Sequence, residues 1–179
     1  MDSTNRREGV PLPIMIICGT GHRPNKLGGY DDATHIRLVE LASKWLAEHP
    51  EATTVISGGA LGWDQALAGA AIVQFRILEL ALPFPGFEDR WPMSSKAHLY
   101  SLIHTGAKTT YVCEGPYAGW KMQERNKWMV DHADQVLALW DGSNGGTSNC
   151  IRYANKVGKP ITNLWDVYND GRRSEQEAS

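Results

Sequence analysis

Three glycine-bearing turns each follow a short apolar run, and each carries groups that could hold an anion. The first turn joins two glycines to a cation in the order Gly19, Thr20, Gly21, His22 and Arg23. Glycine lets the backbone approach a ligand closely, and amides that open a following turn or helix favour negative charge. The third glycine of a dinucleotide fingerprint is absent, so the NAD motif is matched only weakly. A tight strand-to-loop turn with a surface histidine and arginine is the alternative interpretation.

The second turn opens directly onto a predicted helix. It contains Ser57, Gly58, Gly59 and Gly62, and Asp64 falls in the first turn of the helix. Free amides at this position suit phosphate or carbonyl oxygens, and Asp64 could accept hydrogen bonds from ribose hydroxyls. Alternatively, Asp64 only complements the helix dipole, which stabilises a helix by about 0.3–1 kcal/mol.

The third turn has three glycines within the five residues 142–146 and also leads into a predicted helix. Its last residues are Gly145, Gly146 and Thr147, with Thr147 expected to cap the helix. Such a run forms an anion-binding nest or, alternatively, a plain flexible loop. Because the carboxyl ends of parallel strands meet at one edge of a sheet, three such turns predict a common site.

Further candidates come from a helix start and from aromatic residues. Arg125 and Asn126 open the predicted fourth helix, where Arg125 could bind a phosphate with two donors or simply face solvent. The rigid, aromatic segment Pro83–Pro92 is expected to form one wall of the pocket. Four tryptophans fall at loop edges, where an indole stacks on a base or serves in packing, namely Trp63, Trp91, Trp120 and Trp140.

The elements that must position these residues alternate along the chain. Short apolar runs typical of buried parallel strands occupy residues 14–18, 54–56, 77–82, 110–113, 135–140 and 160–165. Helical patterns lie between these runs. The first ends at His49 and has Asp31 or Asp32 as its cap, and the others cover residues 63–74, 95–104, 123–133 and 148–156. Alternating strands and helices predict an α/β layered sheet with right-handed crossovers. We expect a disordered lead over residues 1–12, one domain over 13–168 and a flexible tail over 169–179.

Composition excludes several classes of protein. The 179 residues suit one domain, and 18 Lys and Arg against 20 Asp and Glu give a net charge of −2, without the basic excess typical of nucleic-acid binders. Cys18, Cys113 and Cys150 predict neither a disulfide framework nor a metal pair, which favours a cytoplasmic location. The histidines lack metal-ligand spacing, so no metal is expected. The sequence contains no Walker motif and no apolar run long enough for a membrane span.

The motif set resembles a known family. The segments Gly19–Arg23, Ser57–Asp64, Pro83–Phe84, Arg125–Asn126 and Gly145–Thr147 are similar to the YpsA-like branch of the SLOG superfamily, which groups DprA with the LOG phosphoribohydrolases. The resemblance spans about residues 14–165. It implies a Rossmann-like three-layer fold with a mostly parallel central sheet, a site for a nucleotide or nucleotide-derived small molecule, and a homodimer or higher homo-oligomer. No bound cofactor is expected.

One departure from the LOG pattern bears on chemistry. LOG enzymes follow their glycine loop with a glutamate, whereas Ser148, Asn149 and Cys150 follow Thr147 here. Cleavage of an N-glycosidic bond calls for a nearby carboxylate, and Asp64 is the first candidate, with Glu88 or Asp89 as substitutes. Three functions stay open: a nucleotide-binding sensor or sequestering protein, an N-glycoside hydrolase, and a DprA-like nucleic-acid handler, against which the acidic charge balance counts.

Overall fold

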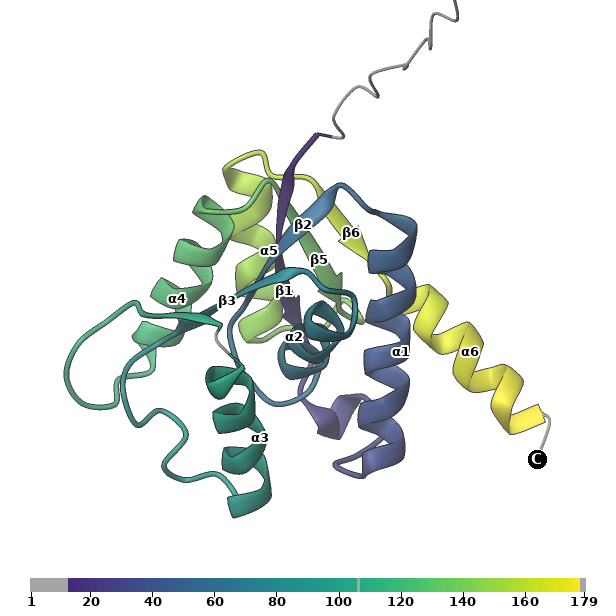
Figure 1. The fold of residues 1–179 in the computed structure, drawn as a ribbon, viewed down its shortest axis with the longest axis horizontal. Coiled ribbons are helices and arrows are strands. Elements are labelled where there is room, and N and C mark those ends of the chain that lie inside the picture. The colour runs from purple at the N-terminus through teal and green to yellow at the C-terminus, as the bar shows by residue number, and fades with distance from the viewer. Residues whose placement is uncertain (1–12, 106, 178–179) are drawn as a thin grey trace, which may run out of the picture.

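The central sheet is parallel throughout and has six strands. In the computed structural model, which describes residues 13–105 and 107–177, the strands are β1 Met15–Gly21, β2 Ala52–Ser57, β3 Ile77–Leu82, β4 Lys108–Tyr111, β5 Gln135–Leu139 and β6 Ile161–Asn163. Their order across the sheet is β4-β3-β2-β1-β5-β6, and every neighbouring pair is parallel. The predicted α/β class, the parallel sheet and the single domain are therefore confirmed (Figure 1).

Helices cover both faces of this sheet and make three layers. They are α1 Asp32–Glu48, α2 Trp63–Val73, α3 Met93–His104, α4 Trp120–Asp131, α5 Gly146–Lys156 and α6 Trp165–Glu177, with a short 3-10 turn, η1, at Pro24–Lys26. One buried cluster joins α1, α2 and α3 to the sheet, and a second joins α4 and α5 to its other face. No helix among the described residues has both the length and the apolar character needed to cross a membrane.

Local sequence accounts for the helices that face the core. Asp31 caps α1, because its carboxylate accepts a hydrogen bond from the Thr34 amide at 2.7 Å, as expected. Helix α2 is buried between the sheet and α1, and its small side chains let the layers approach closely: a Cβ added at Gly69 would lie 3.7 Å from Val39. Cys18 is fully buried in the sheet, whereas Cys113 is half-buried.

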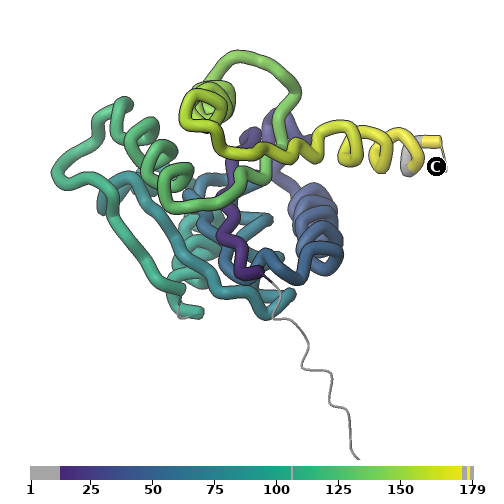
Figure 2. The backbone as a smooth tube through the Cα atoms, turned by 90° about the horizontal axis from the view of Figure 1, so that it is seen from above, coloured from purple at the N-terminus to yellow at the C-terminus, as the bar shows by residue number. Residues whose placement is uncertain are grey.

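The C-terminal boundary differs from the prediction. The chain continues as α6 through Glu177, so the expected end of the domain at residue 168 falls inside a helix. Leu164 and Tyr168 belong to the core cluster beside α1, which anchors the start of this polar helix. The rest of α6 extends away from the other layers (Figure 2). The expected lead over residues 1–12 lies outside the described residues.

Candidate functional site

A polar cavity of about 400 Å³ lies at the carboxyl edge of the sheet, beside β1 and β5. The chain leaves β1 toward β2 on one side, whereas β5 pairs on the other side, so this is the topological switch point of the sheet. The cavity is lined by the loop after β1, the start of α2, one face of α4 and the loop before α5. These residues are Thr20, Gly21, His22, Arg23, Asn25, Lys26, Ala60, Asp64, Met122, Arg125, Asn126, Ser143, Asn144, Gly145, Gly146 and Thr147.

The structure brings most of the predicted site residues together here. Those that line the cavity are Thr20, Gly21, His22, Arg23, Asp64, Arg125, Asn126, Gly145, Gly146 and Thr147. Those that do not are Gly19, Ser57, Gly58, Gly59 and Gly62. The residues of the second group pack behind those that line the cavity.

The Ser57–Gly59 turn braces the cavity floor rather than facing its interior. Ser57 Oγ donates to the Asp64 carbonyl at 2.7 Å and accepts from the Gly59 amide at 3.2 Å. A Cβ at Gly58 would overlap the Arg125 guanidinium and lie 2.6 Å from Asp64 Oδ2. Gly59 has a φ of +67°, and a Cβ there would lie 2.8 Å from a Leu82 methyl group in the core. Glycine is therefore required in this turn by close packing.

Two other glycines allow the start of α2 to pack against the first loop. A Cβ at Gly21 would come within 2.5 Å of Trp63 Cβ, and one at Gly62 would come within 2.5 Å of the His22 carbonyl oxygen. Trp63 is fully buried, and its Nε1 donates to the Leu137 carbonyl at 3.1 Å. Its role is packing, the second of the two interpretations offered by the sequence.

A buried ion pair forms the floor of the cavity. Asp64 is 7% exposed and Arg125 is 6% exposed, and Asp64 Oδ2 lies 4.0 Å from Arg125 Nη1. Arg125 donates from Nη1 to the Gly58 carbonyl and from Nε to Asn126 Oδ1 at 3.0 Å. Burial raises the pKa of Asp64, although the charges of Arg125 and Arg23 act in the opposite direction. Burial also lowers the pKa of Arg125.

A second polar cluster links the first and third loops. His22 Nε2 lies 2.6 Å from Asp141 Oδ1 and also 3.1 Å from the Asp141 backbone amide, which donates to it. Burial alone would raise the pKa of Asp141, but hydrogen bonds from Ser143 and the His22 contact hold it below its usual range. Lys26 Nζ contacts Ser143 Oγ and lies 3.9 Å from Asp141 Oδ2. The cluster thereby holds a cation at the cavity wall.

The N-terminus of α5 opens into the cavity. Added Cβ atoms at Gly142, Gly145 and Gly146 would meet nothing within 4 Å, so this loop borders open space. Gly145, rather than the expected Thr147, is the N-cap, and Ser148 Oγ bonds to the Gly145 amide and carbonyl at 2.9 Å each. First-turn amides of a helix lack intrahelical acceptors, which makes this end attractive to anions.

Several lining residues were not predicted, although the sequence held signals for them. Asn25 and Lys26 continue the first loop, and Ser143 and Asn144 lie inside the third loop. Met122 precedes Arg125 and Asn126 at i, i+3 and i+4 spacing, and therefore shares their helix face. Ala60 lies in the second turn, within the quoted motif. The His22–Asp141 contact could not be predicted without knowing that β1 and β5 are neighbours.

The expected aromatic wall is absent from the lining. None of Pro83–Pro92 lines the cavity. Phe87 instead packs edge-on against Phe84 and Trp91, with ring centroids 6.4 and 5.1 Å apart. Glu88 is buried and accepts from Tyr100 at 3.1 Å, Asp89 is exposed, and neither residue lines this cavity.

The remaining loop-edge tryptophans do not line the cavity either. Trp140 Nε1 donates to the Ser143 carbonyl at 2.8 Å and braces the third loop. Trp120 is exposed at the start of α4.

The fold is shared with solved structures. DNA processing protein A from Helicobacter pylori, which binds single-stranded DNA, superposes with a TM-score of 0.60 at 20% identity, covering 84% of this chain and 65% of that one. This chain therefore spans less than two thirds of that protein. The molybdenum cofactor carrier protein of Chlamydomonas reinhardtii gives a TM-score of 0.52 at 14% identity, covering 84% and 75% of the two chains. At these identities the likeness concerns the fold alone.

Sequence comparison defines the family. The profile of the YspA SLOG family matches residues 17–160, and the chain belongs to this family. It is 30% identical over 142 residues to the uncharacterized SPbeta prophage-derived protein YoqJ of Bacillus subtilis (strain 168), which covers 67% of this chain and 83% of YoqJ.

Proposed function

We propose that the cavity binds a nucleotide or a nucleotide-derived small molecule, in a sensing or sequestering role. The observation that carries this proposal is the distribution of charge within one cavity of about 400 Å³. Arg23, Lys26 and the open N-terminus of α5 attract an anionic group, whereas Asp64 offers a hydrogen-bond acceptor. A phosphorylated sugar presents both an anion and hydroxyl donors.

The size and polarity of the cavity support a small charged metabolite. The first-turn amides of α5 belong to Gly146 and Thr147, two of the lining residues. Phosphate groups bind well at such helix ends, because several amides converge and the helix dipole adds to the attraction. Arg125 is held by Gly58 and Asn126, and so presents a fixed positive charge beneath the ligand.

Calorimetry with a panel of nucleotides and NAD-derived molecules tests this proposal. The sharpest variant is Gly146→Asp, because a side chain there meets no neighbouring atom and an acidic residue suits a helix N-terminus. We expect the variant to fold and to bind at least about tenfold more weakly, about 1.4 kcal/mol. Gly171→Asp on α6 is the matched control and should bind as the wild type does. Equal binding by both variants would exclude the α5 site.

Hydrolysis of an N-glycosidic bond is the second candidate function. The environment of Asp64 supports this candidate, because burial raises the pKa of its carboxyl toward the range useful for proton transfer. Incubation with the same panel should release base and ribose phosphate if the chain is a hydrolase, and Asp64→Asn should abolish release. Full turnover by Asp64→Asn would remove this assignment, and ligand stabilisation without product would favour the sensing role.

Nucleic-acid handling and self-association are separate questions with direct tests. Tight binding of single-stranded DNA with a steep salt dependence would favour a DprA-like role, which the net charge of −2 argues against. The family resemblance implies a homo-oligomer, and analytical sedimentation of the full chain would measure its oligomeric state.

A further inference from the structure

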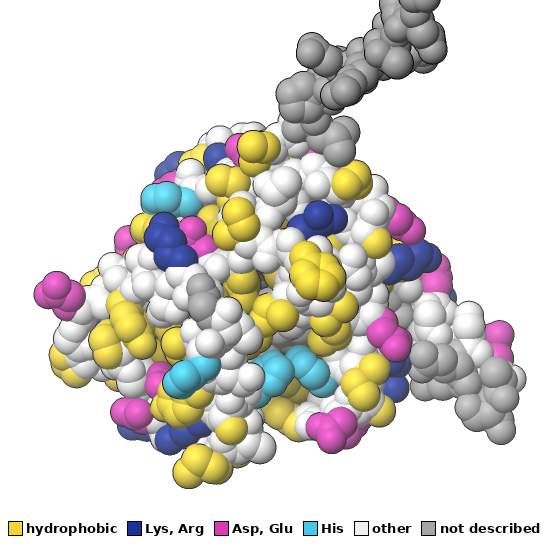
Figure 3. Space-filling view, in the orientation of Figure 1, with side chains coloured by type: hydrophobic (Ala, Val, Ile, Leu, Met, Phe, Trp, Pro, Cys, Tyr) yellow, Lys and Arg dark blue, Asp and Glu magenta, His cyan; other side chains and the backbone are white. Residues whose placement is uncertain are grey.

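A second cavity of about 230 Å³ lies on the other side of the first loop. It is lined by the start of α1, the first two turns of α3 and the residues that open α2. Pro24 and Gly62 separate it from the first cavity, and the two approach closely, since a Cβ at Gly62 would lie 3.1 Å from Pro24 Cδ. Figure 3 shows histidine side chains gathered over this junction of α1 and α3.

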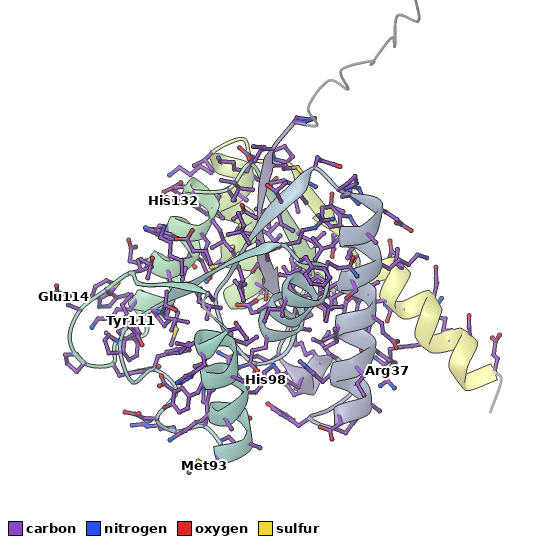
Figure 4. The ribbon with its side chains drawn as sticks, viewed as in Figure 1. Arg37, Met93, His98, Tyr111, Glu114 and His132 are labelled. Carbon is purple, nitrogen blue, oxygen red and sulfur yellow. The ribbon has the colours of Figure 1, made fainter. Side chains whose placement is uncertain are left out.

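A pair of neutral histidines lies in this cavity. His35 of α1 and His98 of α3 meet edge to face, with ring centroids 4.8 Å apart and an interplanar angle of 82°. Figure 4 shows His98 on the side of α3 that faces α1. Burial lowers the pKa of both imidazoles, and each ring therefore carries an uncharged acceptor nitrogen at neutral pH.

One of these ring nitrogens lacks a partner. Within the described part of the chain, His98 Nε2 is shielded from solvent and makes no hydrogen bond. A buried polar atom of this kind costs about 1–3 kcal/mol when it is left unsatisfied. Such atoms in folded proteins call for an explanation, and a bound ligand is one of the few available.

The charges around the histidines favour a donor-rich ligand. Asp31 and Asp32 line the cavity, and hydrogen bonds from Thr34 keep the pKa of Asp31 below its usual value. Tyr30 also lines it and is 68% exposed. Among the described residues the lining includes no lysine or arginine, although Arg37 lies behind it and donates to Thr34 Oγ1 at 3.0 Å. An acceptor-rich cavity with an aromatic residue at its rim suits a positively charged group.

We propose that this second cavity binds a small organic cation that carries amine or guanidinium groups. Its N–H groups would donate to the Asp32 carboxylate and, once the half-buried His98 ring turns to expose Nε2, to that nitrogen, while its charge lies beside Tyr30. A metal ion fits less well, because no group of three His, Cys, Asp or Glu side chains in residues 13–105 and 107–177 is arranged to hold one. The site is independent of the nucleotide cavity and of its proposed function.

Calorimetric titration of the full chain with 1,4-diaminobutane and methylguanidinium tests this proposal. At neutral pH and low salt we expect saturable binding that weakens at least roughly tenfold in Asp32→Asn and in His98→Gln. Glu48→Gln, at the far end of α1, and His104→Gln, at the far end of α3, are the matched controls and should bind as the wild type does. Tyr30→Ala is a third variant that should also bind the amines more weakly. Because Tyr30 is exposed, this substitution should leave the fold intact.

Each result decides for or against the second site. Gly146→Asp should leave amine binding unchanged, which separates this site from the nucleotide cavity. Absence of saturable binding, equal binding by Asp32→Asn, His98→Gln and Tyr30→Ala, or binding of Zn²⁺ without binding of either amine would overturn the proposal.

Discussion

Breaking the buried pair between Asp64 and Arg125 should destabilise the chain strongly. At the observed 4.0 Å separation, Coulomb attraction amounts to about 4 kcal/mol with an effective dielectric constant of about 20. Arg125→Met also removes the hydrogen bond to Gly58 and leaves Asp64 buried without a counter-charge. Loss of one partner of a buried pair typically costs about 3–5 kcal/mol, and we expect a loss of unfolding free energy in this range.

The pH dependence gives this prediction a second signature. Burial already raises the pKa of Asp64 above its ordinary value of 3.8, and removal of the Arg125 charge should raise it further. A carboxyl whose folded pKa is raised contributes stability that is complete below its unfolded pKa and lost as pH rises through the folded value. The deficit of Arg125→Met should therefore be smallest in acid and grow toward neutral pH.

Urea unfolding followed by tryptophan fluorescence measures both effects. The double variant Asp64→Asn, Arg125→Met should recover part of the loss, because no buried charge remains. Arg173→Met is the control, since Arg173 is 77% exposed and its replacement should change stability by about 0.5 kcal/mol or less. A loss below about 1 kcal/mol for Arg125→Met, or a deficit independent of pH, would refute the electrostatic reasoning.

Two further predictions concern packing and protonation. Gly21→Ala should lower the unfolding free energy by about 1–3 kcal/mol, because the added methyl group meets Trp63. Gly171→Ala, where an added methyl group meets no neighbouring atom, is the control and should not destabilise the chain. Equal urea midpoints for the two variants would contradict the predicted clash. His35 and His98 have folded pKa values below the ordinary 6.5, so the stability they contribute is present above that pH and is lost as pH falls through the folded values. His98→Gln should flatten this acid loss in thermal melts, and an unchanged pH profile would exclude the histidine pair as its source.

The strands and most of the helices could be predicted because their signals are local. Short apolar runs mark β1, β2, β3 and β5, and the Asp31 cap marks the start of α1. Helix α6 was missed because its sequence is polar, and only Trp165 and Tyr168 give it an apolar face toward the core.

The gathering of the first and third loops could also be predicted, because parallel strands deliver their carboxyl ends to one edge. What could not be predicted is which glycines face the cavity. Gly146 borders open space, whereas Gly59 lies against Leu82 and Leu99 of the core. The difference depends on how β3 and α3 pack against the second turn, and no local pattern encodes that packing. The predicted placement of Pro83–Pro92 at the cavity wall was wrong for a different reason, because its aromatic rings pack against one another within the segment.

The central claim is that the open end of α5 and the first loop recognise one anionic metabolite. Amide NMR spectra of the isotope-labelled chain, recorded with and without the nucleotides of the panel, test it most directly. We predict that the resonances of Gly146, Thr147 and Arg23 shift together and saturate with one member of the panel. Spectra in which these three amides stay fixed while others move, or in which no nucleotide moves any amide, would contradict the account.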